Sequence, residues 1–225
     1  MKATLRIYGD IIDDSMENGV SPLQIAYELE QLGEVDEIDV HISSYGGSVS
    51  AGLSIYNQLK NHPAKIITHA DGICASVASV IFLAGDERLV NETSLLMIHS
   101  PWVCTMGNAK DLRAEANTLD QIEKASLNIY CTVTGESEET IKSMLDAETW
   151  LDCKQCIELG FATGSEEEQD EVVNVVVQSV KRSLVSRIVG GENPQQKEQE
   201  PVDSNVSTVD SLSNFIKIFQ RKGEQ

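Results

Sequence analysis

The sequence predicts an α/β fold in which helices connect parallel strands. Two successive stretches carry this prediction. The alternating segment Glu37–Ile42 leads through a glycine turn into a stretch of helical periodicity that Pro63 ends. The segment Ala64–Ala70 then leads through a turn at Asp71-Gly72 into a small, apolar helix opened by Ser76. Two such units in succession imply crossover connections, so a functional site is expected at the carboxyl ends of the strands.

The beginning of the chain predicts one further strand and helix. Residues Ala3–Tyr8 alternate between apolar and polar side chains, as in a half-buried strand. Ser21, Pro22 and Gln24 then combine an N-cap, a proline at the first helical position and a capping-box glutamine. A helix is therefore expected to run to about Gln31.

The second half of the chain is predicted to add short strands and one long helix. The apolar positions between Lys110 and Thr134 keep helical spacing until Gly135, and this helix is expected to project because it is longer than the others. The remaining elements are strands at 87–90 and 95–99, the second ending at His99, helices at 137–145 and 152–160, an extended link at Trp150-Leu151, and a last strand at Val172–Val177.

The domain organisation predicted from composition is one globular domain with an appendage. The chain has 225 residues, of which 41% are hydrophobic, and the expected domain covers residues 1–187. Residues 188–204 are too polar to form a core and are interpreted as a linker. The stretch 205–225 is expected to be an amphipathic helix or a disordered tail, with an apolar face made by Val206, Val209, Leu212, Ile216 and Phe219.

Charge and composition exclude several classes of partner. The formal net charge of -19 would repel nucleic acid and anionic membrane surfaces. No apolar run approaches the ~20 residues of a membrane span, and the N-terminus lacks the apolar stretch of a signal peptide, which predicts a cytoplasmic protein. The five cysteines favour free thiols in a reducing compartment. The Cys153-Cys156 pair stands alone, so burial is a better interpretation than zinc binding, and neither a metal nor a cofactor is expected.

The residues that suggest chemistry gather around Ser76. Acyl transfer by a serine needs a base and N–H donors for the oxyanion as well as the nucleophile. Of the four histidines, His99 alone ends a strand of buried character, whereas His41 and His69 lie inside strand patterns. The Gly46-Gly47 turn offers a backbone without Cβ atoms, and the amide of Val77 offers a second donor. Each of these signals is common, and together they suggest a serine hydrolase.

Three motifs in order give a more specific resemblance. The stretches SYGGSVSAGLSIY, GICASVAS and MIHSP resemble those of the Clp protease proteolytic subunit family over roughly Leu5 to Ala162. The resemblance implies a crotonase-like fold of repeated β-β-α units, assembled into stacked heptameric rings that enclose Ser-His-Asp sites. It assigns Ser76 as the nucleophile, His99 as the general base, and the amides of Gly47 and Val77 as the oxyanion hole. The long helix is similar to the handle that joins two rings.

The sequence departs from the family pattern at three places. Tyr45 replaces the proline of the first motif, and the change should be tolerated because both glycines remain. Aligning Trp150-Leu151 with the family's aromatic-leucine pair puts Glu148 in the position of the triad aspartate, while Asp146 remains a competitor. The sequence starts almost on its first strand, which argues against the axial loops that receive an ATPase.

This pattern resembles the Clp-like proteases of bacteriophages and prophages. It predicts a head maturation protease that cleaves capsid or scaffold proteins as a ring homo-oligomer, a heptamer or tetradecamer, without an ATPase. Three alternatives stay open: a degradative Clp peptidase served by an ATPase, a crotonase-type acyl-CoA enzyme, and an inert assembly scaffold.

Overall fold

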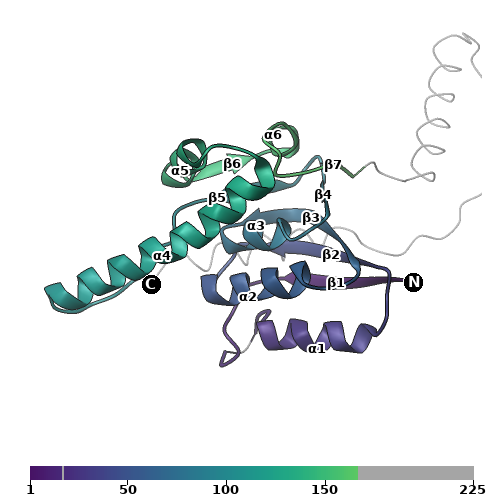
Figure 1. The fold of residues 1–225 in the computed structure, drawn as a ribbon, viewed down its shortest axis with the longest axis horizontal. Helices are drawn as coiled ribbons and strands as arrows, with labels where there is room; N and C mark the ends of the chain where they lie inside the picture. Colours follow the sequence, from purple (N-terminus) through teal and green to yellow (C-terminus); the bar gives the residue numbers. More distant parts are fainter. Residues whose placement is uncertain (17, 167–225) are drawn as a thin grey trace, which may run out of the picture. The chain divides into compact units, whose positions relative to one another are not determined.

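The computed structural model describes residues 1–16 and 18–166, and these form one mixed α/β unit (Figure 1). Its sheet has seven strands, with β1, β2, β3, β4 and β7 as neighbours in that order. Strand β5 also pairs with β3, and β6 pairs with β5. The strands are β1 (Lys2–Tyr8), β2 (Glu37–Ser44), β3 (Lys65–Ala75), β4 (Glu87–Val90), β5 (Leu95–Ile98), β6 (Thr149–Leu151) and β7 (Gly164–Ser165). All pairs are parallel except β5 with β6.

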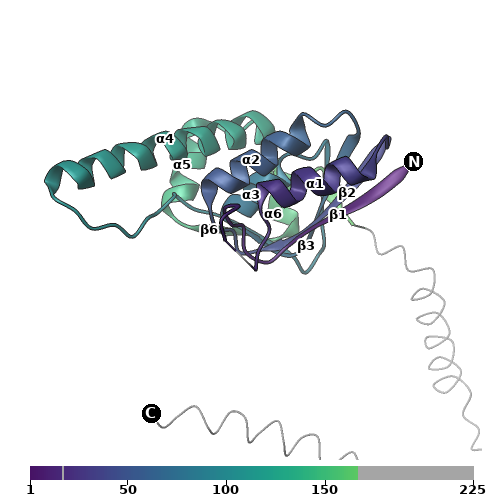
Figure 2. The ribbon, with the colours of Figure 1, turned by 90° about the horizontal axis from the view of Figure 1, so that it is seen from below.

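Helices connect the parallel strands, as the sequence predicts. Figure 2 shows α1, α2 and α3 on the same face of the sheet. The helices are α1 (Pro22–Leu32), α2 (Val49–Lys60), α3 (Val77–Phe82), α4 (Ala109–Thr134), α5 (Glu138–Asp146) and α6 (Cys153–Glu158). The side chain of Ser21 caps α1 by accepting a hydrogen bond from the Gln24 amide, which confirms the predicted start of that helix. Among the described residues, no helix is both long and apolar enough to cross a membrane.

The two faces of the sheet differ in chemistry because side chains alternate along each strand. The helix-covered face is apolar, and its strand residues Leu5, Ile7, Ile38, Val40, Ile42, Ile66 and Ala70 belong to the main core cluster. The opposite face carries charged and polar side chains, including Lys2, Asp39, His41, His69 and Asp71. This alternation fixes the register of the strands, because a shift of one residue would expose the core positions.

The predicted turn at Asp71-Gly72 is wrong. Strand β3 runs without interruption from Lys65 to Ala75 and therefore passes through both residues. The strand continues because its second half gains a new neighbour: Ile67–Ala70 pair with β4, and Ile73–Ala75 pair with β5. The Asp71 side chain accepts a hydrogen bond from the Tyr8 hydroxyl and contacts His41, so it is held by neighbouring strands and does not form a turn.

The long helix α4 matches its predicted bounds to within one residue and extends away from the sheet (Figures 1 and 2). Asn108 and Asp111 form a capping box at its start, and Gly135 ends it in the left-handed conformation. Only the half nearest the sheet is packed, since its buried residues are Leu127 and Tyr130. The helix therefore joins the core through its C-terminal half.

Part of the predicted organisation lies outside the described residues. This applies to the strand Val172–Val177, the linker at 188–204, the helix or tail at 205–225, and the last residues of the domain expected over 1–187. Those expectations stay predictions.

Candidate active site

Three parallel strands end at one edge of the sheet, and each delivers a candidate residue there. Strand β2 leads into Gly46 and Gly47, β3 leads into Ser76, and β5 leads into His99. Because β3 pairs in parallel with both β2 and β5, the carboxyl ends of all three strands meet. The sheet thus brings together residues that lie far apart in the sequence.

Ser76 has an unusual backbone conformation that is held at both ends. Its φ of 56° lies in a region that non-glycine residues rarely adopt. Its amide donates to the carbonyl of Met97 at 2.8 Å, and its own carbonyl accepts from the hydroxyl of Ser79 at 2.6 Å. Such strain persists only where surrounding contacts impose it, and it is typical of functional positions. Here it places a serine between the end of β3 and the first turn of α3.

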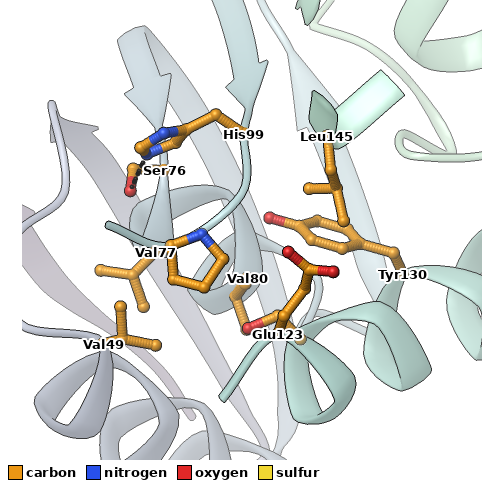
Figure 3. A pocket seen from close by; sticks show the side chains of 10 residues that line it. Val49, Ser76, Val77, Val80, His99, Glu123, Tyr130 and Leu145 are labelled. Atoms are coloured by element: carbon orange, nitrogen blue, oxygen red, sulfur yellow. Dashed lines mark hydrogen bonds between the residues drawn. The ribbon is translucent and has the colours of Figure 1, made fainter. Parts of the chain in front are cut away.

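The Ser76 hydroxyl is hydrogen-bonded to His99. The distance from Ser76 Oγ to His99 Nε2 is 2.8 Å (Figure 3). If Nε2 accepts this hydrogen bond, the ring proton is on Nδ1, and the imidazole is ready to receive the serine proton. Within the described chain, no hydrogen bond joins Nδ1 to a carboxylate. The candidate nucleophile and the candidate base are therefore hydrogen-bonded to each other, and the group that orients the base stays a prediction.

The two glycines before α2 allow the backbone to come close to Ser76 and to the N-terminal loop. A Cβ on Gly46 would lie 2.7 Å from Ser76 Cβ, and one on Gly47 would lie 2.1 Å from the carbonyl oxygen of Ile11. Both residues also have positive φ values. Tyr45 is exposed beside these glycines, and the expected tolerance of its replacement of proline stays a prediction.

Two backbone N–H groups near Ser76 are left without an acceptor. Neither the amide of Gly47 nor that of Val77 donates a hydrogen bond among the described residues. Val77 is the first residue of α3, where helix geometry leaves amides unpaired. Unpaired amides beside a nucleophile are the donors that an oxyanion requires.

The two candidate acids lie in different surroundings. Strand β6 is antiparallel to β5, with Ile98 opposite Thr149, so the register continued by one residue brings Glu148 opposite His99. Glu148 lines the same groove as Ser76 and His99 and has a φ of 48°. Asp146 accepts from the Ser100 hydroxyl at 3.4 Å and lines a separate, shallow depression on α5. The placement favours Glu148, although neither carboxylate is hydrogen-bonded to His99.

A groove and a narrow pocket meet at Ser76. The groove has an empty volume of about 1160 Å³ and is lined by both glycines, Glu148 and the exposed Trp102. The narrow pocket lies between α3 and α4, and its empty space of about 330 Å³ includes the solvent at its open mouth. Both are also lined by His99, so an extended chain in the groove could place one side chain in the pocket.

Sequence analysis missed the residues that α4 contributes to this region. Glu123, Ser126 and Tyr130 line the narrow pocket, and the Tyr130 hydroxyl is 2.7 Å from that of Ser79. Burial raises the pKa of Tyr130, so its phenol stays protonated and can donate this hydrogen bond. The sequence pattern that could have predicted them is their spacing at i, i+3 and i+7, because residues so spaced lie on one face of a helix.

The other histidines lie away from Ser76. His41 and His69 are in the middle of β2 and β3, where carboxylates bind both rings, and the nitrogen Nδ1 of His62 accepts from the Ala64 amide just after α2. Cys156 is buried in α6, and this burial raises the pKa of its thiol to about 12. A thiol so far from ionising at neutral pH is a poor nucleophile and a poor metal ligand.

Comparison with known proteins gives a consistent result. The sequence pattern of the Clp protease family matches residues 2–167. Similar curated proteins include ATP-dependent Clp protease proteolytic subunit 2 of Mycolicibacterium paratuberculosis, with 31% identity over 56% of this chain and 64% of that protein. Subunit 1 of Streptomyces avermitilis is 33% identical over 60% of this chain and 64% of that protein. Subunit 3 of Rhodococcus jostii is 28% identical over 82% and 88%.

The chain thus spans slightly less than two thirds of the first two of these relatives and most of the third. The matched region contains the sheet edge, both glycines, Ser76, His99 and Glu148. The mixed α/β architecture is consistent with the same assignment. The chain therefore belongs to the Clp protease family.

Proposed function

We propose that the protein is a serine endopeptidase that hydrolyses peptide bonds at Ser76. The observation that carries the proposal is the 2.8 Å hydrogen bond between Ser76 Oγ and His99 Nε2, formed beside two unpaired amides. Family membership adds support, because the relatives are named as proteolytic subunits. A structural serine would need neither a strained backbone nor a histidine on its hydroxyl.

The proposed reaction follows from this geometry. His99 Nε2 takes the proton of Ser76 Oγ as the oxygen attacks the carbonyl carbon of the substrate, and the amides of Gly47 and Val77 bind the resulting oxyanion. His99 then returns the proton to the departing amine, which leaves an acyl group on Ser76. A water molecule, activated by His99, releases the acid and restores the serine. Glu148 is proposed to hold the imidazole and to stabilise its charged form.

A fluorophosphonate probe tests the proposal and separates it from its competitors. An activated serine reacts with such a probe, whereas a crotonase-type acyl-CoA enzyme or an inert scaffold has none to label. The full-length protein should be labelled at Ser76, as located by peptide mass spectrometry. Labelling should disappear in Ser76→Ala and persist in Ser79→Ala, whose hydroxyl is buried and bonded to the backbone. Absence of labelling in correctly folded protein would exclude the proposed function.

A ring of identical subunits is the proposed assembly. It is supported by family membership and by the extended N-terminal half of α4, whose apolar Leu112 is exposed. Analytical ultracentrifugation should give a mass of seven or fourteen subunits. A monomer that hydrolyses peptides would contradict the ring and leave the chemistry intact.

Two biological roles fit a peptidase of this kind. Head maturation of a phage, with capsid or scaffold proteins as substrates, is proposed from the sequence pattern and needs no ATPase. The names of the relatives favour the second role, degradation assisted by an ATPase, because they describe ATP-dependent proteases. The roles separate when a folded test substrate is incubated with and without an AAA+ unfoldase and ATP. Cleavage that depends on both would support degradation, and cleavage of a capsid protein without them would support maturation.

A further inference from the structure

The narrow pocket beside Ser76 has a mostly apolar lining that also includes one carboxylate. Its walls include Val49, Val77 and Val80 together with Pro101. Helix α4 adds Glu123, Ser126 and Tyr130 to the lining, so the carboxylate of Glu123 is part of the pocket (Figure 3). A pocket made for an apolar side chain would gain nothing from an acid in this position, because desolvating a carboxylate without a partner costs free energy.

The Glu123 carboxylate is only loosely paired in the free protein. Its side chain is 22% exposed, and among the described residues its one charged contact is Lys142 on α5. The distance from Lys142 Nζ to Glu123 Oε1 is 3.9 Å, beyond hydrogen-bond range, and Lys142 is largely exposed. Pairs of this kind contribute little to stability. The carboxylate therefore keeps most of its capacity to accept hydrogen bonds from a ligand.

In Figure 3 the side chains of Glu123 and Tyr130 both extend from α4 and line the pocket. Tyr130 itself is buried and directs its hydroxyl to Ser79, so it fixes one wall of the pocket and leaves Glu123 as the acidic group there. Val77, which follows the nucleophile directly, lines the same pocket. A side chain entering it therefore belongs to the residue whose carbonyl meets Ser76.

We propose that this pocket selects a lysine or arginine immediately before the scissile bond, and that Glu123 is the residue that determines this specificity. The proposal rests on the proposed serine peptidase activity and adds the substrate class of the same site. A basic side chain has an apolar stem that fits the valine and proline walls, and a charged end that reaches the carboxylate. A charge-assisted hydrogen bond at this end is among the stronger interactions available.

Lysine and norleucine give a matched comparison, because their stems are alike and only lysine carries the ammonium group. In a series of fluorogenic peptides that differ only at this residue, wild-type enzyme should have a kcat/KM about ten- to a hundredfold higher for lysine, as expected for one hydrogen bond to a charged group. Glu123→Gln should remove most of that preference, because kcat/KM for the lysine peptide should fall towards that for the norleucine peptide. Glu123→Lys should favour a glutamate peptide instead.

Two further variants serve as controls. Glu115→Gln removes the same charge from the same helix, two turns before Glu123 and outside the pocket lining, and should keep the lysine preference. Lys142→Met removes the competing cation and should increase the preference. Wild-type enzyme that cleaves norleucine as well as lysine, or a Glu123→Gln variant that keeps the wild-type ratio, would overturn the proposal.

Failure of the specificity proposal is distinguishable from failure of the proposed function. If Ser76 reacts with a fluorophosphonate and the peptides are cleaved without preference for a basic residue, the peptidase stands and the role of Glu123 is wrong. If Ser76 does not react and no peptide is cleaved by folded protein, the proposed function is wrong and the specificity proposal falls with it.

Discussion

Histidines occupy two contrasting regions of the same sheet. His41 and His69 lie side by side in the middle of β2 and β3, with ring centroids 4.4 Å apart. His41 contacts Asp71, and His69 lies between Asp39 and Glu166. His99 instead follows the end of β5, touches the Ser76 hydroxyl, and forms no hydrogen bond to a carboxylate among the described residues.

His41 and His69, the strand-centre pair, each contact a carboxylate, as the histidine of a catalytic triad does. His99 has no such contact among the described residues. In the part of the chain that the structure describes, neither ring of the pair is hydrogen-bonded to a serine or cysteine. The backbone amides around the pair are used in pairing with neighbouring strands, so they are not free to bind an oxyanion. At the sheet edge the pairing stops, so amides are free and the chain can turn sharply. His99 is therefore the candidate base because it follows the end of a strand, whereas His41 and His69 lie inside strands. Contact with an acid does not distinguish the candidate base.

The largest effects should come from the sheet edge. Ser76→Ala and His99→Ala should each lower peptide turnover by up to ~10⁶, because both remove parts of one proton-transfer unit. Steady-state hydrolysis of a fluorogenic peptide measures the loss, and circular dichroism with ultracentrifugation checks that fold and assembly are kept. His41→Gln is the matched control and should keep its activity. More than a few per cent of turnover in Ser76→Ala would contradict the assignment.

Glu148→Gln should have the next largest effect, a loss of about 10⁴ in kcat, since an amide no longer stabilises the imidazolium. Asp146→Asn should cost much less, because Asp146 lines a separate, shallow depression. Measuring kcat for both variants on one peptide decides between them. A larger loss for Asp146→Asn would move the acid by two residues and show that its side chain turns towards His99 in the working enzyme.

Tyr130→Phe tests how α4 supports the strained backbone of Ser76. The hydroxyl of Tyr130 contacts Ser79, which in turn donates to the Ser76 carbonyl. Removing it should lower the free energy of unfolding by about 1 kcal/mol and reduce kcat by no more than about tenfold, because the bond from Ser79 remains. Urea unfolding and kcat against KM at fixed pH measure the two effects. A rise in KM with kcat unchanged would mean that Tyr130 shapes only the pocket.

The smallest effect on activity is expected at the strand-centre cluster, where the effect should be on stability. Although burial opposes it, hydrogen bonds from Lys2 and His69 lower the pKa of Asp39. A lowered pKa in the folded protein means that stabilisation is fully present above the unfolded value of ~3.9 and is lost as the pH falls through the folded value. Asp39→Asn should therefore reduce the free energy of unfolding at pH 7 by about 1 to 3 kcal/mol.

The same variant should also flatten the loss of stability below about pH 4, and kcat/KM at pH 7 should not change. Urea unfolding at a series of pH values measures this. If the free energy of unfolding falls below pH 4 as steeply in the variant as in the wild type, Lys2 and His69 do not stabilise the Asp39 carboxylate.

Local signals in the sequence were enough for much of the fold. The Ser21 cap, the long helix ended by Gly135 and the alternation in β1 and β2 each depend on residues close together in the chain, and each is found as predicted. His99 likewise follows a strand and Ser76 precedes a helix, as predicted, although β3 runs on to Ala75 where a turn was expected. Parallel strands with crossover helices leave few arrangements, so their carboxyl ends could be expected to meet.

Tertiary structure decided what depends on distant neighbours. Asp71 and Gly72 favour a turn by themselves, but β3 continues because β5, far along the chain, offers the second half of β3 a partner. The contribution of α4 to the pocket likewise depends on how that helix packs against α3, which no local pattern encodes. The position of Glu148 opposite His99 comes from the register of β6 on β5, a pairing between segments about fifty residues apart. The sequence by itself determined which residues could do chemistry, and long-range strand pairing and helix packing decided which of them meet.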